Sequence, residues 1–195
     1  MTDASPSRAR WLLLIYRVPQ DPPGRRTYVW RQLKQLGAVY LQQAAAILPD
    51  RPDLRAALEA LAERIQSQEG EVSLLETTSP TETWERDLVE RFNRARDEEY
   101  AEVVENVERF EDEIRRESRK GKFTFAELED SEADWDKIER WQARVVARDF
   151  FGASGRTEAE AALERGKQLL VEFAGAVYRQ EGVQTDGNGP DFQGD

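Results

Sequence analysis

Hydrophobic positions in the first part of the chain come in short blocks, whose spacing alternates between that of a strand and that of a helix. The apolar run at 11–18 is almost continuous and predicts a strand buried on at least one face. Leucines at helical spacing after Asp50, the expected N-cap, predict a helix that ends at Gly70. The blocks follow in the order strand 11–18, helix 25–36, two short strands within 37–48, helix 52–69 and strand 71–76.

This order of elements, β-α-β-β-α-β, is that of a ferredoxin-like domain, in which four antiparallel strands carry two helices on one face. We therefore predict an α+β fold with such a domain at 9–78. Because the arrangement hosts many unrelated functions, it indicates an architecture and leaves the function open.

From residue 79 onward the pattern changes to long amphipathic helices. Apolar residues recur every three or four positions from Trp84 to Ile114, and breaks at 120–124 and 152–155 separate two further helices. A helix of such length needs packing partners to be stable. We predict a long antiparallel helical hairpin or three-helix bundle at 79–182, followed by a disordered, polar and glycine-rich tail at 183–195.

Charge is distributed unevenly along this chain, whose net charge is −11. Residues 1–34 contain seven basic and two acidic residues, whereas residues 79–195 contain 18 basic and 30 acidic residues. The acidic total argues against general nucleic-acid binding, because such a chain repels phosphates. The local excess of basic residues keeps a DNA contact open for the N-terminal part alone.

Seven basic side chains near the N-terminus form the candidate site for DNA or an oxyanion. Guanidinium groups bind phosphates and other tetrahedral oxyanions through two parallel hydrogen bonds, and Tyr16 and Tyr28 are interleaved with them. The competing interpretation is a solvated helix face that also supplies partners for the acidic helices. The seven residues are Arg8, Arg10, Arg17, Arg25, Arg26, Arg31 and Lys34.

Catalytic chemistry has few candidates, because the chain contains no His and no Cys. Their absence excludes zinc sites of these residues, thiol nucleophiles and serine–histidine triads. Carboxylates at one stretch of the long helix could supply an all-oxygen metal site, but exposed pairs with Arg94, Arg96 and similar residues are the favoured interpretation. These carboxylates are Asp97, Glu98, Glu99 and Glu102.

The segment RDFFG at 148–152 contains the Asp-Phe-Gly triplet of protein kinases, without the other kinase motifs. We expect it to end a helix and to dock its two aromatic rings into the seam of the bundle. No recognisable active site remains, so we predict no enzymatic activity, no metal site and no cofactor.

Localisation is suggested by two absences. The apolar run at 11–16 is too short to span a bilayer, so no membrane association is expected. The lack of Cys fits a cytoplasmic protein.

Several segments resemble, in the same order, the N-terminal domain of the ChrB family of chromate-resistance regulators. They are WLLLIYRVP at 11–19, YVWRQLKQLGAVYLQQAAAILPD at 28–50, ERW at 139–141 and RDFFG at 148–152. The similarity covers about residues 9–181. It implies a role in the transcriptional control of chromate-efflux genes. Full-length members also carry a distinct C-terminal domain, which we do not expect in this chain.

The ferredoxin-like part is also similar to the middle domain of PaaX-type repressors and to the small nucleases of CRISPR adaptation. Those nucleases carry a metal-binding aspartate at the end of their first strand, whereas this chain has no acidic residue from Ile15 to Gln20. The difference disfavours nuclease activity. The winged helix of PaaX-type proteins is not expected either, because only about eight residues precede the first strand.

Two functions stay open at this point, and a third is disfavoured. The first is a chromate-responsive, transcriptional regulator-like protein that contacts DNA phosphates, or an oxyanion such as chromate, through the basic set. The alternative is a non-catalytic structural or assembly protein that forms a homodimer and docks a protein partner. A carboxylate-dependent metal hydrolase is disfavoured because no site for it is recognisable.

Overall fold

The computed structural model describes residues 9–19, 21 and 23–182 of the 195-residue chain. Both Arg8 of the candidate basic set and the tail predicted at 183–195 lie outside the described residues. The described residues form two compact units, one of residues up to 97 together with 147–154, the other of residues 98–146 together with those from 155 onward. Contacts thus group residues 79–97 with the first unit, whereas the hydrophobic pattern had set the boundary at 79.

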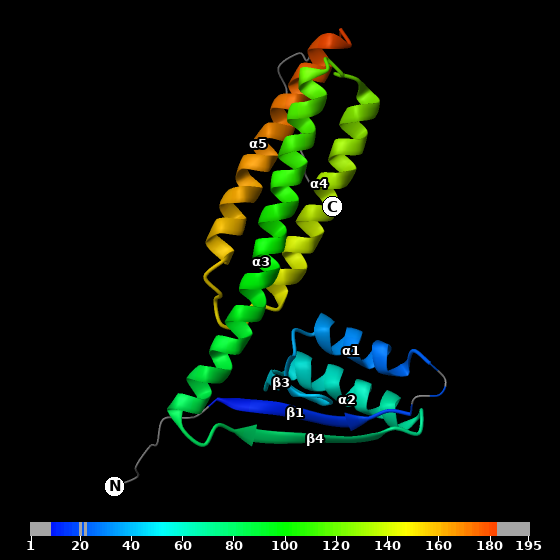
Figure 1. The fold of residues 1–195 in the computed structure, drawn as a ribbon, viewed down its shortest axis with the longest axis vertical. Coiled ribbons are helices and arrows are strands. Elements are labelled where there is room, and N and C mark those ends of the chain that lie inside the picture. The colour runs from blue at the N-terminus through cyan, green and yellow to red at the C-terminus, as the bar shows by residue number, and fades with distance from the viewer. Residues whose placement is uncertain (1–8, 20, 22, 183–195) are drawn as a thin grey trace. The chain divides into compact units, whose positions relative to one another are not determined.

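The first unit opens with six elements in the predicted order. The strands are antiparallel in the spatial order β2-β3-β1-β4, and both helices cover one face of the sheet (Figure 1). This arrangement confirms the predicted α+β, ferredoxin-like fold. The elements are β1 (Arg10–Arg17), α1 (Arg25–Gln35), β2 (Val39–Gln42), β3 (Ala45–Pro49), α2 (Pro52–Gln66) and β4 (Glu71–Thr78).

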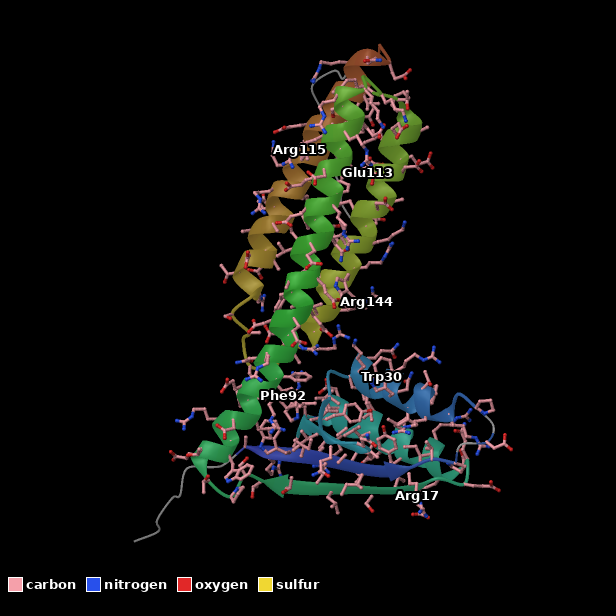
Figure 2. All side chains as sticks on the ribbon, in the orientation of Figure 1. Arg17, Trp30, Phe92, Glu113, Arg115 and Arg144 are labelled. Atoms are coloured by element: carbon pink, nitrogen blue, oxygen red, sulfur yellow. The ribbon has the colours of Figure 1, made fainter. Side chains whose placement is uncertain are left out.

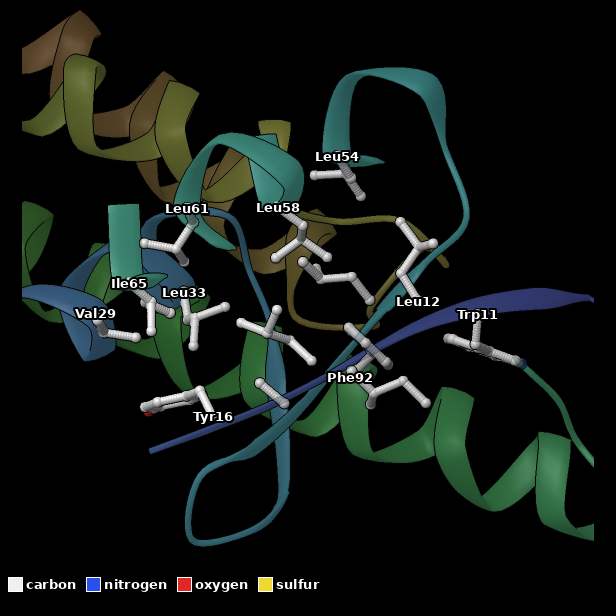
Figure 3. Close-up of a cluster of buried hydrophobic side chains, with 14 residues drawn as sticks. Trp11, Leu12, Tyr16, Val29, Leu33, Leu54, Leu58, Leu61, Ile65 and Phe92 are labelled. Atoms are coloured by element: carbon white, nitrogen blue, oxygen red, sulfur yellow. The ribbon is translucent and has the colours of Figure 1, made fainter. Parts of the chain in front are cut away.

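The side chains of β1 alternate between the two faces of the sheet, as strand geometry requires. Leu12 and Tyr16 are buried on the helix side, where they share a core with Leu33 of α1 and Leu58 of α2 (Figure 3). Ile15 points to the other face and is 45% exposed. The apolar run therefore supplies the core on one side and leaves an apolar surface on the other.

Asp50 does not cap α2, so that prediction is wrong. Arg51 occupies the N-cap position and makes no side-chain cap hydrogen bond. The Asp50 side chain is almost fully buried and pairs with Arg55 at 2.8 Å and with Arg10 at 3.3 Å. Two guanidinium groups offset the burial of one carboxylate, so Asp50 joins the end of β3 to α2 and β1.

The hairpin of β2 and β3 turns at Gln43 and Ala44. Ala44 has a φ of 66°, which lies in the left-handed region that glycine favours. A residue with a Cβ atom is destabilised there by about 1–2 kcal/mol. The Ala44 carbonyl accepts a hydrogen bond from the backbone N–H of Tyr16 at 3.0 Å, which ties the hairpin to β1.

The aromatic pair Phe150 and Phe151 belongs to the first unit. The Phe92 ring stacks on Trp11 at 5.6 Å between centroids and meets Phe151 edge-on at 5.4 Å and Phe150 at 6.1 Å. The expectation that these rings dock into the seam of the bundle is therefore wrong. They extend the core of the ferredoxin-like domain, because Trp11 of β1 is their apolar partner. The spacing of apolar residues along a helix cannot identify a partner on a distant strand.

The second unit contains three helices, as the hydrophobic spacing predicted. They are α3 (Glu82–Arg119), of which residues 98–119 belong here, α4 (Phe125–Ala147) and α5 (Arg156–Gln180). Their shared core includes Val107 and Phe110 of α3, Trp135 of α4 and Phe173 of α5. Within the described ranges, no helix combines the length and the apolar character that crossing a bilayer demands.

Helix α5 packs closely against its neighbours at Gly166. A Cβ atom at this position would lie 2.6 Å from the indole ring of Trp135 and 2.9 Å from Val107. Such distances are well inside van der Waals contact, so an added side-chain carbon would displace its neighbours. The three helices can pack this closely because residue 166 has no side chain.

Candidate functional site

Helix α1 carries Arg26, Arg31 and Lys34 of the candidate basic set at exposed positions. Its apolar side chains Val29 and Leu33 are buried against the sheet, and Gly24 forms the N-cap with a φ of 100°. The exposed positions are Thr27, Arg31 and Lys34 on the other side, and Arg26 and Trp30 on the flank beside the β2–β3 hairpin. An amphipathic spacing of 3.6 residues per turn accounts for this division.

Three of the predicted basic residues are engaged elsewhere. Arg10 pairs with Asp50, Arg17 with Glu71, and the Arg25 guanidinium donates to the carbonyl of Gln68 at 2.8 Å. Figure 2 shows Arg17 and Trp30 on opposite sides of the sheet. The structure therefore does not bring the predicted set together at one site.

Arg26, Arg31 and Lys34, here called the basic face, are the remaining members. All three are exposed, and within the described residues none of them forms an ion pair. The Lys34 ammonium lies 5.5 Å from the centre of the Trp30 ring, a cation–π contact. The basic face thus leaves three cations available to a ligand.

A pocket of about 450 Å³ opens between α1 and the β2–β3 hairpin. Its sheet side is formed by Tyr16 of β1, by Tyr40 and Gln42 of β2, and by the turn residues Gln43 and Ala44. The hydroxyls of Tyr16 and Tyr40 lie 3.0 Å apart and share a hydrogen bond. This side therefore combines two aromatic rings with hydroxyl and amide groups.

The helix side of the pocket comes from Arg26, Thr27 and Trp30. These residues supply a guanidinium group, a hydroxyl group and an indole ring that is 46% exposed. No carboxylate lines the pocket among the described residues. In so acidic a chain, this pocket can favour an anion over a cation.

Tyr40 stays protonated in this environment. Burial raises the pKa of its phenol, and the hydrogen bond with Tyr16 raises that pKa further, whereas the nearby charge of Arg26 opposes the shift. A protonated phenol can donate a hydrogen bond, so the tyrosine pair is a donor at neutral pH.

The hairpin side of this pocket was not predicted from the sequence. The sequence indicated Tyr16 as an aromatic neighbour of the arginines, whereas Gln42 and Gln43 entered only as part of the two short strands expected within 37–48. Two adjacent amides at a turn that lacks the usual Asn-Gly or Asp-Gly were the available signal.

Of the four carboxylates proposed as an alternative site, Asp97 contacts Ser154. The Ser154 hydroxyl lies 3.3 Å from both carboxylate oxygens of Asp97, and Arg94 pairs with Glu90 at 3.2 Å. No group of three or more acidic residues among those described is arranged to hold a metal ion.

The Asp-Phe-Gly triplet has a local structural role. The carboxylate of Asp149 accepts hydrogen bonds from the backbone N–H groups of Gly152 at 2.9 Å and Ala153 at 3.0 Å. These bonds fix the turn that follows α4 and so position the two phenylalanines.

Comparison with known proteins identifies relatives over most of the chain. Residues 26–184 match the family model described as Protein ChrB, N-terminal. A curated relative, Protein ChrB of Cupriavidus metallidurans, is 37% identical over 99 residues. The match covers 51% of this chain but 30% of that protein, so the chain spans under a third of its length.

Proposed function

Because the chain belongs to the ChrB N-terminal family, we propose that it is a chromate-responsive, transcriptional regulator-like binding protein that contacts DNA phosphates through the basic face of α1. The family match confirms the resemblance that the sequence had shown to these chromate-resistance regulators. The function includes no catalytic step, and it takes place in the cytoplasm, where the DNA lies.

The observation that carries the proposal is the exposure of Arg26, Arg31 and Lys34 on one helix. Paired arginines such as Arg10 and Arg17 have their charge offset by a carboxylate, so they attract phosphate less. The basic face has no such partner within the described residues. It is therefore a positive surface in a chain of net charge −11.

Helix geometry favours several phosphates over one small oxyanion. At roughly 100° per residue, Arg26 and Arg31 point about 140° apart around the axis of α1, so they do not clamp one ion together. Arg26 and Lys34 lie about 12 Å apart along that axis. Phosphates spread along a DNA strand can meet cations at such separations.

The test is a salt titration of binding to duplex DNA from the promoter of the protein's own gene. Three phosphate contacts predict that log K falls with log salt with a slope of about −2.7. The variant Arg26→Ala/Arg31→Ala/Lys34→Ala should bind more than tenfold more weakly in low salt and lose most of that slope.

The matched control is Arg119→Ala/Lys167→Ala/Arg179→Ala, which removes the same charge from exposed positions of the second unit. It should keep the wild-type slope. Equal loss in both variants would mean that net charge alone governs binding, and unchanged binding by the basic-face variant would contradict the proposal.

Chromate response is tested in the same assay. Chromate should change the affinity for DNA beyond the change that sulfate causes at equal ionic strength. Both ions are tetrahedral dianions that screen charge alike, so a difference between them reports a response specific to chromate. An identical response to the two ions would remove the chromate-specific part of the proposal.

A second candidate function, assembly as a homodimer, is favoured by the open face of the sheet. Ile15 and Leu75 lie on the face opposite to α1 and α2 and are 45% and 48% exposed. Trp84 at the start of α3 is 64% exposed. A patch of such side chains is typical of a protein–protein contact, and a second copy of the chain is the proposed occupant.

A further inference from the structure

The pocket between α1 and the β2–β3 hairpin has a chemistry that the proposed DNA contact does not use. We propose that it binds one nucleotide, with the phosphate on Arg26 and Thr27 and the base against Trp30 and the Gln42–Gln43 amides. The site shares Arg26 with the basic face, and its other residues are separate from the DNA contact.

The lining of the pocket indicates an anionic ligand. Arg26 supplies a full positive charge, and no carboxylate among the described lining residues opposes it. Thr27 lies in the first turn of α1, whose N-cap makes no side-chain hydrogen bond. The first backbone N–H groups of a helix have no partner within the helix, so this end adds donors suited to a phosphate.

The tyrosine pair leaves one hydrogen-bond donor unused. Two hydroxyls share a single hydrogen bond at 3.0 Å, so one of the two protons is not consumed by the pair. The Tyr16 side chain is buried and lines the pocket together with Tyr40. A ligand oxygen in the pocket would therefore accept the remaining proton.

The size of the pocket excludes a simple oxyanion as its full occupant. Its volume of about 450 Å³ is much larger than the roughly 30 Å³ that one water molecule takes in the liquid. A tetrahedral oxyanion is the size of a few waters and would occupy only part of it. The pocket falls within the usual range for organic ligands, about 300–1,000 Å³.

The aromatic and amide groups identify the organic part as a flat heterocycle. The Lys34 ammonium lies over the Trp30 ring, but Trp30 is still 46% exposed and lines the pocket. A planar group can therefore stack on Trp30. Gln42 and Gln43 carry both donors and acceptors, which match the edges of a nucleobase. Arg26 and Trp30 are four residues apart, about 6 Å along the helix, so phosphate and base can be bound together.

The experiment is isothermal titration calorimetry of the full chain with AMP, GMP, CMP and UMP, followed by adenosine and inorganic phosphate. At least one mononucleotide should bind, and it should bind at least tenfold more tightly than its nucleoside or phosphate alone. Phosphate binding as tightly as the nucleotide would overturn the proposal, as would the absence of mononucleotide binding.

Variants separate this site from the DNA contact. Arg26→Ala should weaken nucleotide binding roughly tenfold or more, and Tyr40→Phe and Gln42→Ala about fivefold each. Arg31→Ala, on the same helix but outside the pocket, should leave nucleotide binding unchanged. Circular dichroism checks that each variant is folded.

Duplex DNA completes the design. The variant Tyr40→Phe/Gln42→Ala should bind duplex DNA like the wild type, while Arg31→Ala should lose DNA affinity and keep nucleotide affinity. A nucleotide effect that follows Arg31 would mean that only surface charge is at work, and it would contradict the pocket. Failure of DNA binding alone would leave the nucleotide site supported.

A single-stranded oligonucleotide identifies the source of the nucleotide. If it binds more tightly than the mononucleotide and depends on Tyr40 and Gln42, the ligand is an unpaired nucleotide of a strand. If the mononucleotide binds at least as tightly, the ligand is free. Either outcome requires the pocket residues, and independence from them would contradict the proposal.

Discussion

Ala44 has a left-handed backbone conformation, which glycine adopts more easily than a residue with a methyl side chain. The turn between β2 and β3 places this residue at a φ of 66°, and its carbonyl still accepts a hydrogen bond from Tyr16. The conformation persists because both strands of the hairpin are paired around it. The turn also forms one wall of the pocket.

The substitution Ala44→Gly should therefore stabilise the protein. Relief of the left-handed strain is expected to add about 1 kcal/mol to the free energy of unfolding, after the greater freedom of glycine in the unfolded chain is deducted. Urea denaturation followed by circular dichroism measures the change.

Ala45→Gly is the matched control, because Ala45 lies in β3 outside the left-handed region. It should lower the free energy of unfolding by about 0.5–1 kcal/mol. Loss of stability in both variants would show that Ala44 is not strained.

Single residues also mark the limit of what the sequence could predict. The alternation of burial along β1 followed from its apolar run, because strand geometry has a fixed period. The partners of Arg10, Arg17 and Arg25 did not, because each comes from a residue 40 to 54 positions away. The folded structure is needed to show which basic residues of the predicted set have a partner and which do not form an ion pair among the described residues.

At the scale of elements, the contact of α5 with α3 and α4 depends on Gly166. Glycine in the middle of a helix costs about 1 kcal/mol relative to alanine, so its presence needs a packing reason. The short distances that an added Cβ atom would make to Trp135 and Val107 provide that reason.

Gly166→Ala should lower the free energy of unfolding by up to about 2 kcal/mol. Overpacking destabilises by about 1–3 kcal/mol, and better helix propensity offsets about 1 kcal/mol of this. Chemical denaturation gives the value directly.

Gly175→Ala in the same helix is the control. The nearest atom to a Cβ there is the end of the flexible Arg179 side chain at 3.4 Å, so stability should rise by up to about 1 kcal/mol. A gain in both variants would show that α5 does not pack tightly at Gly166.

Elements were predicted best where their periodicity was long. The three helices after residue 79 followed from apolar residues every three or four positions, and the predicted breaks lie close to the observed ends. The packing of Phe150 and Phe151 was predicted wrongly. The spacing of apolar residues shows which side of an element is apolar, but it does not show which other element covers that side. The pocket was missed for the same reason, since its walls come from separate elements.

At the scale of the whole molecule, function has to be assigned to local surfaces. Residues 79–195 hold most of the negative charge, and three exposed cations of α1 form the proposed DNA contact. The open face of the sheet carries the exposed apolar side chains Ile15 and Leu75, beside the ion pair of Arg17 and Glu71. The two proposals, DNA contact and self-association, therefore concern opposite sides of one sheet.

Self-association predicts a dimer by sedimentation equilibrium. The variant Ile15→Glu/Leu75→Glu should sediment as a monomer, because two carboxylates on the apolar face would be buried unpaired in a dimer. Its circular dichroism should match that of the wild type.

Val171→Glu serves as the control, since Val171 is 59% exposed on α5 in the other unit. It should remain a dimer. A wild-type protein that sediments as a monomer at all concentrations would contradict the assembly proposal.

The first compact unit takes its residues from two separated stretches of chain, and Phe150 and Phe151 in the later stretch pack with Trp11 and Phe92 in the earlier one. A ribosome makes the polypeptide from the N-terminus, so all six elements of the ferredoxin-like domain emerge long before these two rings do. In the nascent domain, Trp11 therefore lacks part of its apolar cover until α4 and the two phenylalanines that follow it have been synthesised.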